Sequence, residues 1–176
     1  MKIIGVACSC LARSNSLKAV EAFLKGAAEA GHETELIRLD RDLHGCIGCQ
    51  ACKKEGAGLC VQKDVLTRYF ELLPEAGAVV LGAGNYMGYA QGEAWTFMNR
   101  HYCLSGPDRK LKIEPGKKLF AIFAQGSPDN PAYREHYDVM CRPFDGMGFV
   151  RQEVLIVSRD TAEEKIKEAY ELGKAL

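Results

Sequence analysis

The chain has 176 residues, with 23 basic and 23 acidic side chains, so its formal net charge is zero. This length fits one domain, and 47% hydrophobic residues are enough to bury a core. A neutral chain lacks the cationic surplus of nucleic-acid-binding proteins, so we expect no nucleic-acid partner. No apolar run approaches the roughly 18 residues of a membrane span, and the short apolar start does not fit a signal peptide. We therefore expect a cytoplasmic protein without membrane contact.

Apolar runs alternate with segments of helical periodicity along the chain. The apolar runs predict five buried strands, at 2–7, 33–39, 76–83, 118–125 and 152–158. The periodic segments predict helices at 14–31, 64–73, 94–103, 133–148 with a break at Pro143, and 161–176 with a capping box of Thr161 and Glu164. Strands separated by helices imply a parallel sheet covered on both faces. We expect an α/β fold with a single domain over residues 1–176.

In such sheets ligands bind beyond the carboxyl ends of the strands. The loop at 7–16 joins the first strand to the first helix and carries Ser9, Ser14, Asn15 and Ser16. Their hydroxyl and amide groups, with the free N–H groups of the helix start, suit a phosphate, and Arg13 could add charge. An ordinary capped helix start would use the same residue types, so this loop alone favours phosphate binding only modestly.

Two further loops lie at the same edge of the predicted sheet. The loop at 82–92 has four glycines, which let the backbone approach a flat ligand, and tyrosines that could stack on it. The loop at 124–130 offers Gly126 and Ser127 to the edge of a ring. Each loop taken alone is also compatible with a simple connection.

Together the three loops resemble those of the flavodoxin-like NAD(P)H-dependent FMN reductases. The first loop of that family reads approximately GSPRxxSNT, and CSCLARSNS occupies its place here, with Cys10 and Leu11 where the family has Pro and Arg. GNYMG resembles the family's PxYxG, with Gly84 in place of the proline. MNR at 98–100 resembles the family's DR pair, with Asn99 in place of the aspartate.

The resemblance implies a flavodoxin-like three-layer sandwich, a five-stranded parallel sheet of order 2-1-3-4-5, and bound FMN. It also implies a homodimer or higher homo-oligomer with the flavin near the interface, and NAD(P)H as a candidate reductant. The protein would orient and tune the flavin, so we expect no catalytic acid or base. The predicted FMN-binding residues are Ser9, Leu11, Arg13, Ser14, Asn15 and Ser16 at the phosphate, Ala83, Gly84, Asn85, Tyr86, Met87 and Gly88 at the ring, and Gln125, Gly126 and Ser127 at its pyrimidine edge.

Four of the eight cysteines lie in a segment at 44–62, which reads as a cysteine-rich insertion after the second strand. Cys46, Cys49 and Cys52 recur every third residue, and Cys60 follows a glycine-containing loop. Such spacing lets one short segment wrap an iron–sulfur cubane. Zinc is an alternative, although closed zinc sites usually pair two distant CxxC knuckles, and a redox CxxC explains only two of the four thiols. Disulfides and free thiols also remain open.

The segment resembles the compact cysteine motif of iron–sulfur flavoproteins, a branch of the same reductase family. By this resemblance, the ligands of a [4Fe–4S] cluster would be Cys46, Cys49, Cys52 and Cys60. The other cysteines, Cys8, Cys10, Cys103 and Cys141, are expected in the core. The four histidines have no metal-type spacing, and Arg100 is expected on a helix face or near the flavin.

These observations support three functional hypotheses. The first is an electron-transfer flavoprotein that passes electrons between a [4Fe–4S] cluster and FMN, with a ferredoxin-type partner. The second is an NAD(P)H-dependent FMN or quinone reductase without a cluster. The third is a zinc-stabilised, non-enzymatic binding module, which would leave the serine-rich and glycine-rich loops without a purpose.

Overall fold

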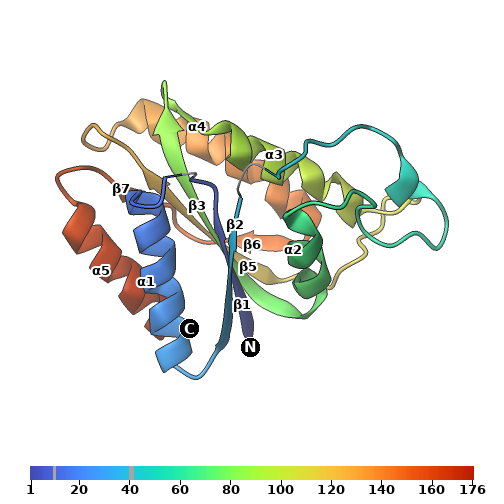
Figure 1. Ribbon diagram of the computed structural model, residues 1–176, viewed down its shortest axis with the longest axis horizontal. Coiled ribbons are helices and arrows are strands. Elements are labelled where there is room, and N and C mark those ends of the chain that lie inside the picture. The colour runs from blue at the N-terminus through green and yellow to red at the C-terminus, as the bar shows by residue number, and fades with distance from the viewer. Residues whose placement is uncertain (10, 40–41) are drawn as a thin grey trace.

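A parallel β-sheet forms the middle layer of the computed structural model, which describes residues 1–9, 11–39 and 42–176 (Figure 1). Its order is β2-β1-β3-β5-β6, with β7 also paired to β5, so the predicted order of the five strand positions is confirmed. The short β4 pairs antiparallel with β3. The strands are β1 (Lys2–Ala7), β2 (Glu33–Arg38), β3 (Ala76–Tyr86), β4 (Tyr89–Ala90), β5 (Lys117–Ala124), β6 (Phe149–Arg151) and β7 (Leu155–Val157).

Helices cover both faces of the sheet, which confirms the three-layer architecture (Figure 1). Helices α1 and α5 pack on one face, and α2, α3 and α4 on the other. None of the helices in the described ranges combines the length and hydropathy of a transmembrane segment. The α-helices are α1 (Asn15–Glu29), α2 (Leu66–Leu72), α3 (Gly92–Arg100), α4 (Pro131–Cys141) and α5 (Ala162–Lys174), and the 3-10 helices are η1 (Ala51–Lys53), η2 (Leu73–Glu75), η3 (His101–Leu104) and η4 (Arg142–Met147).

Helices α1 and α5 touch backbone to backbone at two glycines. A Cβ atom on Gly26 would lie 2.1 Å from the carbonyl oxygen of Tyr170, and one on Gly173 would lie 2.0 Å from that of Phe23. No larger residue fits either position without moving the backbone. This contact fixes α1 closely against α5.

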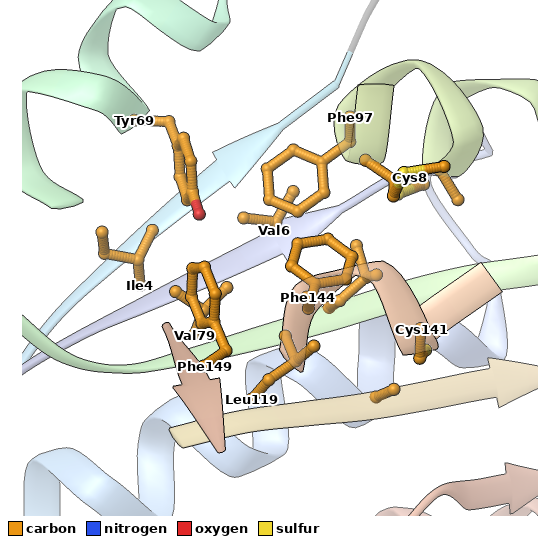
Figure 2. Close-up of a cluster of buried hydrophobic side chains, with 14 of the residues drawn as sticks. Ile4, Val6, Cys8, Tyr69, Val79, Phe97, Leu119, Cys141, Phe144 and Phe149 are labelled. Atoms are coloured by element: carbon orange, nitrogen blue, oxygen red, sulfur yellow. The ribbon is translucent and has the colours of Figure 1, made fainter. Parts of the chain in front are cut away.

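The larger core lies between the sheet and α2, α3 and α4 (Figure 2). Aliphatic side chains of the sheet meet an aromatic group that includes Tyr69, Phe97, Phe144 and Phe149. Cys8, Cys103 and Cys141 are buried, as predicted. Cys10 lies outside the described residues.

The fifth strand was predicted as one segment over 152–158, and this prediction is wrong in detail. Residues Phe149–Arg151 pair with the first half of β5, and Leu155–Val157 pair with the second half. Between these two pairings β5 advances three residues while the edge strand advances four. The extra residue is a β-bulge, a common feature of edge strands, and it divides the strand into β6 and β7.

The segment 82–92 was predicted as a loop, but part of it forms a hairpin. Strand β3 continues to Tyr86, and β4 returns beside it. Met87 and Gly88 form the turn with φ of 55° and 90°. Positive φ at both central residues is the type I′ geometry that matches the twist of antiparallel strands.

Two helix ends also test the sequence predictions. Helix α4 ends at Cys141, two residues before Pro143, as predicted. The predicted capping box of α5 is absent, because Thr161 has no side-chain bond to its helix. Its hydroxyl instead accepts from the backbone N–H of Ser158 at 3.3 Å and lies 2.8 Å from the hydroxyl of Ser158.

Candidate functional site

A cleft of about 510 Å³ opens at the edge of the sheet where β1, β3 and β5 end. This volume falls in the usual range of small-ligand sites. Ten of the fifteen residues predicted to bind FMN line it, and Ala124 and Arg159, which were not predicted, line it too. The lining residues are Ser9, Leu11, Ser14, Asn15, Ser16, Gly84, Asn85, Tyr86, Ala124, Gln125, Gly126 and Arg159.

The other five predicted residues do not line the cleft. Arg13 and Ser127 are exposed beside it, and Ala83 is buried in β3. Met87 and Gly88 form the hairpin turn, where the Met87 side chain is 96% exposed. In this segment the residues that line the cleft are therefore those of β3 that precede the turn, Gly84, Asn85 and Tyr86.

Serine hydroxyl groups accept backbone hydrogen bonds within the loop after β1 and at the start of α1. The Ser14 hydroxyl accepts from the backbone N–H of Leu17 at 3.2 Å and so caps α1. The Ser9 hydroxyl accepts from the N–H of Leu11 at 3.2 Å. The N–H groups of Asn15 and Ser16, in the first turn of α1, have no acceptor within the helix. Both residues line the cleft, so this end of it offers N–H and hydroxyl donors beside the positive end of a helix dipole.

Gln91 ties the first two loops together. Its side-chain amide donates to the carbonyl oxygen of Cys8 at 2.7 Å and to a carboxylate oxygen of Glu93 at 2.8 Å. Its side-chain oxygen accepts from the N–H of Gly84 at 2.9 Å. The sequence analysis missed Gln91, since it does not line the cleft and acts only through other residues.

A second network ties the loop after β3 to the loop after β5. The amide of Asn85 donates to the hydroxyl oxygen of Tyr137 at 2.5 Å, and that hydroxyl donates to the side-chain oxygen of Gln125 at 3.0 Å. The ring of Tyr137 stacks on Phe123 with centroids 4.0 Å apart. Burial raises the pKa of Tyr137, which keeps its hydroxyl protonated and able to donate. Tyr137 was also missed, because it approaches the cleft from α4.

The charges around the cleft favour an anionic ligand. Among the described residues that line it, Arg159 is charged and none is acidic. One Arg159 nitrogen lies 3.9 Å from the position that a Cβ on Gly126 would take. Arg159 follows β7, whose carboxyl end lies at the same edge as those of β1, β3 and β5. That shared edge is a signal that could have identified it.

The four cysteines of the predicted cluster motif line a second, smaller cavity. It measures about 20 Å³, room for about one water molecule, and its other lining residues include Arg100 and Cys103. The cysteine-bearing loop projects at one end of the molecule, and the cleft lies at the other, where β1, β3 and β7 end (Figure 1). Within the described ranges, no three His, Cys, Asp or Glu side chains are grouped so that they could hold one metal ion. A group larger than a water would therefore require residues 46–50, which are exposed, to move outward.

Two lysines anchor the other half of this loop. The ammonium of Lys112 donates to the carbonyl oxygens of Cys52, Ala57 and Gly58 at 2.5–3.0 Å. The ammonium of Lys53 donates to the carbonyls of Tyr102 and Ser105 at 2.7 Å. The half that carries Cys52 is thus held in place, while the half that carries Cys46 and Cys49 lies exposed.

Cys103 is a fifth thiol at this cavity, but it differs from the other four. It is 2% exposed, and burial raises its pKa to about 12. Because metal ligands are thiolates, the raised pKa makes the loss of the proton that ligation requires less favourable at Cys103 than at an ordinary thiol. The donor set is then four thiols without a carboxylate among the lining residues, which suits soft metals and iron–sulfur clusters.

Arg100 forms a fully buried ion pair with Asp64 beside this cavity. Its Nη1 donates to an oxygen of Asp64 and to the carbonyl of His44 at 2.7 Å, and its Nη2 donates to the other Asp64 oxygen at 3.3 Å. Burial raises the pKa of Asp64, but hydrogen bonds from Arg100 and from the N–H groups of His44 and Leu66 outweigh this effect and hold the pKa below its ordinary value, so the carboxylate is ionised. The expectation that Arg100 is a charge on a helix face is wrong, because Asp64 draws its side chain into the interior. Arg100 does not line the cleft, so the alternative of a contact near the flavin remains a prediction.

The profile of the NADPH-dependent FMN reductase family matches residues 1–140, four-fifths of the chain. This chain belongs to that family. The match confirms the resemblance inferred from the loops, and it includes the cysteine segment. Membership also accounts for the position of the cleft at the carboxyl edge of the sheet.

Individual proteins of known sequence or structure are also similar to this chain. An iron-sulfur flavoprotein of Methanocaldococcus jannaschii is 36% identical over 101 residues, which are 57% of this chain and about half (51%) of the relative. An iron-sulfur flavoprotein of Archaeoglobus fulgidus is 25% identical over 181 residues, covering 100% of this chain and 79% of the relative. The structure of an NAD(P)H:quinone oxidoreductase from Methanothermobacter marburgensis superposes with a TM-score of 0.77 at 18% identity, covering 99% of this chain and 94% of the other. This superposition confirms the flavodoxin-like fold.

Proposed function

We propose that this chain is an FMN-binding oxidoreductase that passes electrons between a [4Fe–4S] cluster and FMN. The observation that carries the proposal is the presence of two sites of different chemistry in one fold. One is a donor-rich cleft in which none of the described lining residues is a carboxylate, and the other is a cavity lined by four thiols. The names of the two iron-sulfur flavoproteins support both halves of the proposal.

In the cleft, the chain's own groups would bind and orient the cofactor. Ser9, Ser14, Asn15 and Ser16 would hold the phosphate, because they surround the first turn of α1. Gly84, Asn85 and Tyr86 would lie against the ring, with Gln125 and Gly126 at its pyrimidine edge. Bound flavin would supply the redox chemistry, and the protein would supply position and fixed dipoles. To these residues we add Arg159 as a contact of the anionic ligand.

At the other end of the molecule, Cys46, Cys49, Cys52 and Cys60 would hold the cluster. The residues fit such a group by their chemistry, since four thiols face one cavity beside a buried guanidinium that has an unused N–H. A cluster there would supply a one-electron centre. The chain would contribute the thiolate ligands, the lysine-anchored half of the loop, and the exposed half that can move to admit the cluster.

Because the two sites lie at opposite ends of one chain, we expect a second copy of the chain to take part in the proposed electron transfer between cluster and FMN. Tyr86, Met87 and Tyr89 expose 51–96% of their surface on the hairpin beside the cleft. Exposed aromatic and apolar side chains grouped next to a binding site often mark an interface. We therefore expect a homodimer or higher homo-oligomer that covers the hairpin, and a ferredoxin-type protein as the external electron partner.

Anaerobic purification followed by iron, sulfide and flavin analysis tests the proposal. The expected result is bound FMN together with iron and sulfide in equal amounts, about four of each per chain, with the iron lost when Cys49 and Cys52 are both replaced by serine. A protein that binds FMN but takes up no iron after reconstitution would instead be a reductase without a cluster. A colourless protein with one zinc and no flavin would be a binding module. Either result contradicts the proposal.

A further inference from the structure

One buried donor beside the cysteine cavity has no partner. Arg100 is 1% exposed, and its Nε–H makes no hydrogen bond in the described part of the chain. Its other two nitrogens are bonded to Asp64 and His44. A buried polar group left without a partner is unfavourable, and more so when it is charged. Such a group calls for an explanation.

The guanidinium cannot turn this N–H elsewhere. It is planar, and its bonds to the Asp64 carboxylate and the His44 carbonyl fix the orientation of its plane. Arg100 lines the same cavity as Cys60 and the other three cysteines.

The charges on all sides of the cavity determine what this donor can do. Asp64 neutralises the charge of Arg100 in the ion pair, so the guanidinium contributes mainly the dipole of its free N–H. Lys112 and Lys53 add positive charge near the cysteine-bearing loop, where they hold loop carbonyls. A thiolate-ligated cluster becomes more negative when reduced, and hydrogen bonds to its sulfur atoms favour that reduced form.

We propose that Arg100 is a positioning residue that donates its free Nε–H to sulfur at the cysteine site and raises the reduction potential of the cluster held there. This inference rests on the proposed function, because it needs a cluster bound by Cys46, Cys49, Cys52 and Cys60. Asp64 serves this role by fixing the direction of the donor. No group in the cleft takes part.

Arg100→Lys tests the inference, because lysine keeps the positive charge near Asp64 but has no equivalent of Nε–H. The measurement is a redox titration of the cluster followed by electron paramagnetic resonance. The reduction equilibrium is expected to fall roughly tenfold, which is about 59 mV for a one-electron couple. The FMN potential in the same sample should stay unchanged, because the cleft lies at the other end of the molecule.

Asp64→Asn is the matched control. It breaks the same ion pair but retains Arg100 and its Nε–H, and the amide oxygen of asparagine can still accept from the guanidinium. Because it removes the negative charge that neutralised Arg100, the cluster potential should not fall below that of the wild type. An equal fall in both variants would overturn the inference, because the effect would then arise from lost packing. An Arg100→Lys variant that holds its cluster at the wild-type potential would overturn it as well.

A double variant covers the case in which Arg100→Lys does not fold, as judged by circular dichroism. Asp64→Asn with Arg100→Gln exchanges the buried ion pair for a neutral hydrogen-bonding pair, which avoids an unpaired buried charge. It lacks the Nε donor and should show the same tenfold fall, and a wild-type potential in it contradicts the inference. Failure of the proposed function would look different, because the wild-type chain itself would then hold no iron.

Discussion

The side-chain amide of Gln91 donates a 2.7 Å hydrogen bond to the carbonyl oxygen of Cys8, a residue 83 positions away in the sequence. Through its side-chain oxygen the same amide also holds the N–H of Gly84. One buried side chain therefore fixes the loop proposed to bind the phosphate relative to the loop proposed to bind the ring. The spacing of the two halves of the cleft depends on it, although Gln91 does not line the cleft.

Gln91→Leu should weaken FMN binding without abolishing the fold. Leucine has a similar volume but leaves the Cys8 carbonyl and the Gly84 N–H without their partner, so the free energy of unfolding of the apoprotein should fall by about 2 kcal/mol. We expect the Kd for FMN, measured by quenching of flavin fluorescence, to rise roughly tenfold. Gln152→Leu, away from the cleft, is the matched control and should leave the Kd unchanged. An unaltered Kd in Gln91→Leu would show that the two loops hold their spacing without it.

The sequence predicted those parts of the site that depend on local chemistry. A serine before an amphipathic segment caps a helix wherever that helix lies, so a capped helix start at this serine-rich loop could be expected from a few neighbouring residues, and the structure shows Ser14 as the cap. The cysteine spacing is equally local, and all four cysteines do line one cavity. The strand order came from the resemblance and from the alternation of strands with helices, which does not depend on side-chain detail.

Contacts between segments that are distant in the chain could not be predicted from the sequence. Tyr137 reaches Asn85 across 52 positions, and Arg100 reaches Asp64 across 36. Nothing near Arg100 in the sequence distinguishes a buried ion pair from an exposed helix charge. The bulge that splits the edge strand depends on its register with β5, a pairing that no short sequence window contains.

Ser14 should matter to both the helix and the ligand, and two substitutions separate these roles. Ser14→Ala removes the cap of α1 and should lower the free energy of unfolding by about 1 kcal/mol. Ser14→Asp keeps a capping oxygen, so stability should stay near that of the wild type, but its charge would repel a phosphate. Urea unfolding and FMN titration of both variants check this. If Ser14→Asp bound FMN as tightly as the wild type, the phosphate would not lie at this loop.

Arg159 should contribute more to FMN affinity than Arg13, although only Arg13 was predicted from the sequence. Arg159 lines the cleft, whereas Arg13 is exposed outside it. Arg159→Ala should raise the Kd for FMN several-fold at low ionic strength, with a smaller effect in about 1 M salt, where charges are screened within about 3 Å. Arg13→Ala is the matched control and should have the weaker effect. The reverse ranking would move the anion to the other side of the loop.

His101 should make stability depend on pH, since its imidazole is buried among aromatic rings. The carbonyl of Phe97, 2.7 Å from Nδ1, can only accept, so Nδ1 carries the proton and Nε2 accepts from the hydroxyl of Tyr69, also at 2.7 Å. Burial lowers the pKa of His101 to about 4. Between that value and the ordinary value near 6.5, the unfolded chain binds a proton that the folded chain does not. Stability contributed by the neutral ring is therefore complete above about pH 6.5 and declines as the pH falls toward 4.

Urea unfolding at intervals between pH 7 and pH 5 measures this dependence. Over the part of the window from pH 6.5 to 5, the free energy of unfolding should fall by about 2 kcal/mol in the wild type. In His101→Phe that fall should disappear, because no buried imidazole remains to be protonated. Tyr69→Phe, which removes the hydroxyl partner but keeps the imidazole, should retain the fall at a lower overall stability. A fall that persists in His101→Phe would assign the pH dependence to groups elsewhere, since the paired carboxylates, among them Asp64, lose their contribution only at lower pH.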